Sequence, residues 1–249
     1  MKRLMSGAVI VGVMLTFLAA GCGKNQGPSA GDVIEARKPE ALKKRDALVT
    51  VLDAAAKLPA LKAPEGAVDP AMDVQPLARN SPATSPSWNC LVLHDVQVSI
   101  LRDPSKPGPA GTIWLPERAS RLALEAAVTG RADGSPADIK SQGELNEWFD
   151  ALAGLKYAIV IHSIEYTLPM AEGKTFTQGR CVCEARVYRL EGATYLGGFR
   201  FAASGTSESV QAWGGKSQMY VEIDFKRFAE AAFNAELKKL FPGTGTEIR

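Results

Sequence analysis

Two consecutive stretches of alternating residues, 176–190 and 195–203, constrain the fold of this chain more than any other feature of its sequence. In the first stretch, one face of the expected strand carries apolar side chains and the other carries charged ones: Cys181, Cys183, Ala185 and Val187 against Arg180, Glu184 and Arg186. The turn Glu191-Gly192-Ala193 between the two stretches predicts an antiparallel hairpin. The chain must therefore form a sheet whose apolar face is covered by other elements.

Further strands and several helices are predicted around this hairpin. Strands are expected over 88–101, 157–168 and 219–223, and the run from Ala158 to Ile161 suits a central strand covered on both faces. Helices are expected from apolar residues at helical spacing over 39–58, 116–129, 141–154 and 225–241. Ser141 and Glu144 form a capping box at the start of the third helix. This order predicts an α+β domain with an antiparallel or mixed sheet, helices packed on one face and a C-terminal amphipathic helix.

The first 22 residues have the three parts of a secretory signal peptide. Lys2 and Arg3 precede an apolar run of about 17 residues, which ends in small residues before Cys22. A run of that length is at the short limit for crossing ~30 Å of hydrocarbon, and no later segment is longer. Leu18-Ala19-Ala20-Gly21-Cys22 resembles the lipobox of bacterial lipoproteins, with Ala19 at the position where leucine is usual. The alternatives are ordinary cleaved secretion and an uncleaved membrane helix.

The resemblance to bacterial lipoproteins implies cleavage before Cys22, acylation of that cysteine with palmitate-like chains, and attachment to the lipid bilayer. Gly23 stands where enteric lipoproteins of the inner membrane carry aspartate, so the resemblance implies an outer-membrane protein that faces the periplasm. The order of elements from Ser141 to Phe241 faintly resembles the periplasmic domains of curli-secretion and penicillin-binding-protein-activator lipoproteins. That likeness carries no motif and assigns no functional residue.

Four segments are expected along the chain. Residues 1–21 are the lipoprotein signal peptide, 22–87 a lipidated tether with a helix and a proline-rich linker, 88–242 a single α+β domain and 243–249 a tail. The basic run Lys43-Lys44-Arg45 in the tether is most simply a solvated helix face, with contact to anionic lipid as the alternative.

Charge and export limit the classes of partner and the state of the cysteines. The chain has 29 basic and 27 acidic side chains, and removal of the leader with Lys2 and Arg3 leaves 27 of each, which disfavours a nucleic-acid partner. Outside the cytoplasm, disulfides persist. The three cysteines of the domain allow one disulfide, from Cys90 to Cys181 or Cys183, and unpaired buried thiols are the alternative.

The sequence contains few motifs that are typical of catalytic or metal-binding sites. A metal site built from the cysteines and His94 would lack the two-residue loop of structural zinc sites, so no metal and no cofactor is predicted. Nucleophile elbows, phosphate loops and zinc-protease pairs are absent, and a hydrolytic triad would have to use His94 or His162, the only histidines. No catalytic residue is assigned.

These observations favour a non-enzymatic envelope lipoprotein whose domain binds or scaffolds another envelope protein. Its candidate partner-binding loop is Trp213-Gly214-Gly215, unless Trp213 folds back over the sheet. One alternative is a periplasmic hydrolase with an unfamiliar site at His94 or His162. The other is a carrier of an apolar ligand, which requires that Phe228, Phe233 and Leu237 leave a cavity beneath the last helix.

Overall fold

A four-stranded sheet organises the part of the chain that the computed structural model describes, residues 28–62, 89–95, 101, 118–130, 142–172, 175–205 and 217–240. Its strand order is β1-β2-β5-β6, with β1 (Cys90–His94) parallel to β2 (Tyr157–Thr167). β5 (Arg180–Arg189) and β6 (Thr194–Ser204) continue the sheet in antiparallel pairing, joined by the 3₁₀ turn Glu191–Ala193. The predicted α+β class, mixed sheet and hairpin are confirmed.

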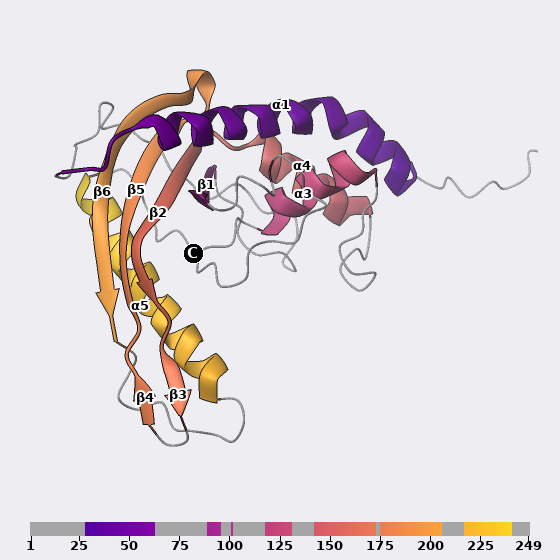
Figure 1. Ribbon diagram of the computed structural model, residues 1–249. Helices are drawn as coiled ribbons and strands as arrows, with labels where there is room; N and C mark the ends of the chain where they lie inside the picture. Colours follow the sequence, from indigo (N-terminus) through magenta and orange to yellow (C-terminus); the bar gives the residue numbers. More distant parts are fainter. Residues whose placement is uncertain are drawn as a thin grey trace, which may run out of the picture.

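Helices cover both faces of the sheet, not one face as expected. Figure 1 shows α5 (Ser217–Leu240) running along one side of the long strands, while α1 (Ala30–Lys57) crosses the other side near one end. α3 (Arg118–Thr129) and α4 (Gln142–Ala153) pack with α1. The sheet therefore separates two apolar clusters, and the whole run from Tyr157 to Ile161 is buried, as predicted for a strand covered on both faces.

A small ribbon extends the sheet at its other end. β3 (Met170–Glu172) and β4 (Thr175–Thr177) pair with each other and continue β2 and β5 away from α1, as Figure 1 shows. β2 changes character along its length: its first five residues are buried, and the residues from His162 to Thr167 are half-buried or exposed. One end of the sheet is thus enclosed by helices, and the second half of β2 is less buried than the first.

Helix α1 corrects the expectation that residues 22–87 form a tether separate from the domain. A capping box between Ser29 and Asp32 starts the helix at Ala30, so Pro39 lies inside it and is not in its first turn. Its buried residues, Val33, Ile34, Ala41, Leu48, Val51, Leu52 and Ala55, belong to the core shared with α3 and α4. Residues 30–57 therefore belong to the folded domain, which was expected to begin near 88, while residues 63–87 lie outside the described ranges.

The start of α5 corrects a second expectation. Met219, Val221 and Ile223 alternate as in a strand, yet residues 219–223 form the first turns of the helix. Its buried residues recur every four positions, at Val221, Phe225, Ala229, Phe233 and Leu237, so packing onto the sheet selects the helical period. The strand expected over 176–190 is divided into β4 and β5, β3 was not expected, and β1 ends at His94; the remaining elements agree with prediction to within a few residues.

Candidate functional site

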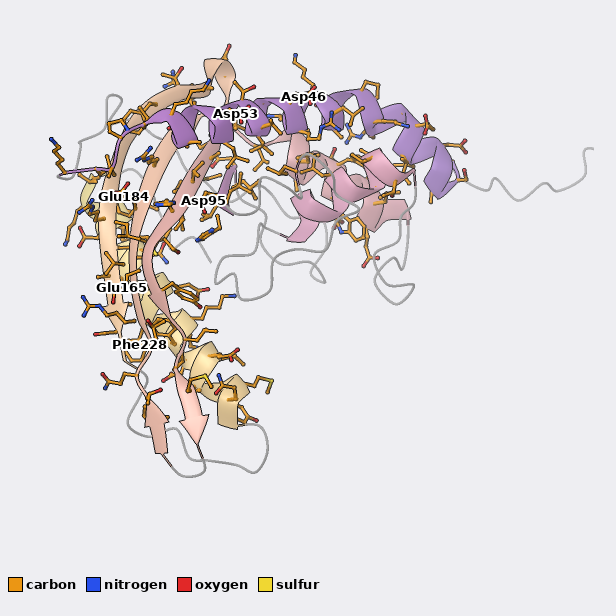
Figure 2. The ribbon with its side chains drawn as sticks, in the orientation of Figure 1. Asp46, Asp53, Asp95, Glu165, Glu184 and Phe228 are labelled. Atoms are coloured by element: carbon orange, nitrogen blue, oxygen red, sulfur yellow. The ribbon has the colours of Figure 1, made fainter. Side chains whose placement is uncertain are left out.

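A cluster of polar side chains lies where the edge strand β1 ends beside the middle of β2. It consists of His94, Asp95, His162 and Ser163, here called the polar cluster. His94 Nε2 lies 2.8 Å from Ser163 Oγ, and His94 Nδ1 lies 2.8 Å from Asp95 Oδ1. His162 Nδ1 hydrogen-bonds the other carboxylate oxygen, Asp95 Oδ2. Figure 2 shows Asp95 beside β2, on the side away from β6.

The carboxylate fixes the positions of the protons. An ionised carboxylate only accepts hydrogen bonds, so His162 Nδ1 carries the ring proton that faces Asp95 Oδ2. In the tautomer with its proton on Nδ1, His94 Nε2 accepts a hydrogen bond from the Ser163 hydroxyl. Burial would raise the pKa of Asp95, but its contacts with His94 and His162 outweigh that effect and lower the pKa to about 2. Asp95 is therefore ionised at neutral pH.

Exposure differs sharply among the members of the polar cluster. His94 is 8% exposed, whereas 57% of the His162 side chain and 35% of the Asp95 side chain are exposed. Asp95 Oδ1 is itself buried and has no well-directed hydrogen bond, although His94 Nδ1 lies beside it. Ser163 is half-buried and precedes a β-bulge, because Ile164 has no counterpart in the register with β5. Bulges redirect side chains and are frequent beside active sites.

The three cysteines of the domain are free and buried, so the structure shows unpaired thiols and not the disulfide. Cys90 stands opposite Tyr157 of β2, whereas Cys183 stands opposite Ser163, about six residues or ~20 Å further along the strand. Disulfides require Cα atoms within ~7 Å of each other, so this fold separates Cys90 too far from Cys183 and from Cys181 beyond it. Burial raises the pKa of Cys90, and the hydrogen bond with Cys181 together with burial raises that of Cys183.

Alkylation of the protein, denatured without reductant, should therefore modify all three thiols. After trypsin digestion, the peptide 181–186 should carry two adducts and the peptide containing Cys90 one, as measured by mass spectrometry. In the native protein these thiols should react far more slowly, because all three are buried and inaccessible to the reagent. Unmodified Cys90 paired with an unmodified Cys181 or Cys183 would contradict this strand arrangement.

No metal-binding arrangement links these cysteines to His94. Cys90 and His94 lie on β1, and Cys181 and Cys183 lie on β5, with β2 between the two strands. Within the described ranges, no group of three histidine, cysteine, aspartate or glutamate side chains is placed to hold a metal ion. Ser163 Oγ does lie 3.7 Å from Cys183 Sγ, which extends the polar cluster toward β5.

A second candidate site is a cavity of about 870 Å³ between α1 and the ends of β2 and β5 nearest to it. It is lined by Glu40, Lys43, Lys44 and Ala47 of α1, by Ala153, Leu155, Lys156 and Tyr157, and by Arg189, Leu190, Glu191 and Gly192. The lining thus includes four basic side chains and two acidic ones. Lys44 is half-buried and donates a hydrogen bond to the Leu155 carbonyl, and burial lowers the pKa of its ammonium group.

The candidate residues named from the sequence lie at several different places in the structure. Lys43 and Lys44 line the cavity, whereas Arg45 pairs with Asp46 on the exposed side of α1. Phe233 and Leu237 are buried against the sheet, whereas Phe228 is 42% exposed. This packing removes the support for a ligand cavity beneath α5. The loop Trp213-Gly214-Gly215, the segment with Cys22 and the tail 243–249 lie outside the described residues.

Sequence reasoning named His94 and His162 but missed Asp95, Ser163 and the cavity. Asp95 follows His94 directly, and Ser163 follows His162, so two adjacent pairs form the polar cluster. The parallel pairing of β1 with β2 brings these two pairs of residues together, and no local sequence pattern predicts that pairing.

Within the described residues, none of the helices is both long and apolar enough to cross a membrane. Comparison with models of protein families, with curated proteins and with solved structures finds no match to this chain.

Proposed function

We propose that this protein is an envelope lipoprotein, held on the outer membrane by acylated Cys22 and facing the periplasm, whose domain binds an anionic envelope component. The cavity beneath α1 carries the proposal, and the lipobox-like segment with Gly23 supports the location. Its volume is within the ~300–1,000 Å³ typical of sites for small ligands.

The cavity combines positive charge with an apolar floor. Lys43, Lys44, Lys156 and Arg189 outnumber the acidic Glu40 and Glu191, so the local field favours an anion. Buried Leu155, Tyr157 and Leu190 lie at the same cavity and offer apolar contact. A ligand with a carboxylate or phosphate group and an apolar part matches both features.

The position of α1 shortens the tether that we propose. The helix cap at Ser29 is seven positions after Cys22, and an extended chain of that length spans at most ~25 Å. The domain would therefore remain near the bilayer, within reach of lipid headgroups and of proteins at the membrane surface. Two or more acyl chains on Cys22 would give the stable attachment that a single chain lacks.

Charge reversal in the cavity tests the binding function. The intact lipidated protein, purified from membranes, should release an anionic compound when it is denatured, measured by mass spectrometry of the extract. The double variant Lys43→Glu, Lys156→Glu should retain at least about tenfold less, since reversing two contacting charges exceeds the ~1.4 kcal/mol that corresponds to a factor of ten. Both lysines are exposed, so the fold should tolerate the change.

The matched control is Lys57→Glu, Lys62→Glu, which makes the same charge change at exposed lysines outside the cavity and should release the wild-type amount. Equal release from both double variants, or no anionic compound from the wild type, would rule out the cavity as the binding site. Cys22→Ser tests the anchor separately, because it should move the protein from the membrane fraction to the periplasmic fraction.

A further inference from the structure

The polar cluster has the order of groups that activates a serine for attack on a carbonyl. Ser163 Oγ hydrogen-bonds His94 Nε2 at 2.8 Å, and the opposite ring nitrogen of His94 lies 2.8 Å from the carboxylate of Asp95. We propose that this cluster hydrolyses uncharged carboxylic esters, with Ser163 as the nucleophile and His94 as the general base. This activity is separate from ligand binding in the cavity beneath α1, which none of these residues lines.

A histidine whose only role is to satisfy hydrogen bonds inside a core would have partners that are as buried as itself. His94 is 8% exposed, but its partners Ser163 and Asp95 are only half-buried and lie where the described pairing of β1 with β2 ends. β1 pairs with β2 only as far as Ile161, and no other described strand lies on that side of β2. His94 is thus shielded from water, and its partner Ser163 is half-buried between His94 and Cys183, so the serine has a base withdrawn from solvent beside it, as acyl transfer requires.

The reaction proceeds in two balanced steps. Ser163 Oγ attacks the carbonyl carbon of the ester while its proton passes to His94 Nε2. The C–O bond to the alcohol then breaks, the alcohol takes the proton from His94, and an acyl group remains on Ser163. Water attacks this acyl group as His94 accepts a proton from the water. The C–O bond to Ser163 breaks, the serine recovers its proton from His94, and a carboxylic acid leaves.

Asp95 and His162 act as positioning residues. The carboxylate of Asp95 beside His94 Nδ1 favours the tautomer with its proton on that nitrogen, which leaves Nε2 able to accept the serine proton. His162 hydrogen-bonds Asp95 Oδ2 and thereby fixes the rotation that leaves Oδ1 beside His94. The ionised Asp95 also repels anions near Ser163, which favours a neutral carboxylic ester over a phosphate ester.

A fluorophosphonate probe tests the nucleophile directly. An activated serine displaces fluoride from the probe and forms a stable phosphonyl adduct, so the full-length protein should gain one adduct at Ser163, located by peptide mass spectrometry. Ser163→Ala should lose both the adduct and the hydrolysis of p-nitrophenyl butyrate. His94→Gln should slow labelling by about 100-fold or more, the contribution expected of a general base.

Ser204 provides the matched control, since it is an exposed serine on β6 and far from the polar cluster in the sheet register. Ser204→Ala should label and hydrolyse like the wild type. Circular dichroism spectra and melting temperatures of all variants establish that the fold is retained. Absence of an adduct at Ser163 in the wild type, or unchanged ester hydrolysis by Ser163→Ala, would overturn the proposal.

The role of His162 needs a readout that folding alone does not change. His162→Gln should lower kcat and displace the pH profile of labelling, with KM little altered, because the variant changes the orientation of Asp95 and not the contact with the ester. Equal changes in kcat and KM with an unaltered pH profile would show that His162 has no positioning role.

Discussion

Replacing Arg186 with Met should lower the free energy of unfolding by about 3–5 kcal/mol, the usual cost of removing one partner from a buried ion pair. Arg186 is 6% exposed and donates to Glu184 Oε2 at 3.1 Å. It also donates to the carbonyls of Ala55, Leu58 and Pro59, at 2.6, 3.1 and 2.6 Å. One guanidinium therefore joins the end of α1 and the residues after it to the sheet.

The expected loss is large because nothing replaces these bonds. Glu184 is 1% exposed, and a methionine would leave it with Arg200 and the Leu61 N–H alone. Burial would raise the pKa of Glu184, but hydrogen bonds from Arg200, Arg186 and Leu61 outweigh it and hold the pKa below its usual range. The variant therefore leaves a buried carboxylate that is still charged and three carbonyls that have lost a donor.

Urea unfolding followed by circular dichroism measures the effect, with Arg200→Met as the control. The Arg200 side chain is 43% exposed and hydrogen-bonds the same Glu184 at 2.8 Å, so water can replace part of what is lost. We expect Arg200→Met to cost about 1 kcal/mol, near the value for exposed pairs. Losses of equal size in the two variants would contradict the bridging role of Arg186 between α1 and the sheet.

This bridge also shows what the alternating pattern of β5 could not predict. The pattern placed Cys181, Cys183 and the other apolar residues on one face correctly, because side-chain period follows from strand geometry alone. It placed charged residues on the opposite face but did not predict that Glu184 and Arg186 are buried there. Alternation distinguishes the two faces of a strand, but it does not show that a distant segment will cover the charged one.

The misplacement of α1 has a related cause. Glycine, serine and polar residues before Asp32 are typical of a flexible tether, and Pro39 is typical of a first helical turn. The capping box at Ser29 outweighs both signals, because it satisfies backbone donors at the helix start and lets Val33 and Ile34 reach the core. Local composition was a weaker guide than the cap and the buried face.

The polar cluster depends on contacts between residues far apart in the sequence. His94 and Ser163 are 69 residues apart, and Asp95 and His162 are 67 apart. The sequence predicted both strands, but it offered no evidence that β1 would pair with β2, in parallel and ending beside Ile161. Parallel pairing needs a long connection, and its register is set by packing of the whole domain. Individual residues were therefore predictable, and their association was not.

Replacing Phe233 with Ala should destabilise the fold by about 3–5 kcal/mol, as expected for removal of a fully buried aromatic ring. Phe233 has no exposed surface. Its ring centroid lies 5.7 Å from that of Phe199 and 5.5 Å from that of Phe201, both on β6. The ring thus fills the space between α5 and the sheet, and alanine would leave a void that rigid neighbours could only partly close.

Phe228→Ala is the matched control, because it makes the same substitution on the same helix at a side chain that is 42% exposed. It should change the free energy of unfolding by less than about 1 kcal/mol, as most surface substitutions do. Urea unfolding of the two variants measures the difference. In a carrier of apolar ligands, the space beneath α5 would already be partly empty, and Phe233→Ala would cost little more than Phe228→Ala. A large difference between the variants therefore separates a packed core from a ligand chamber at this face of the sheet.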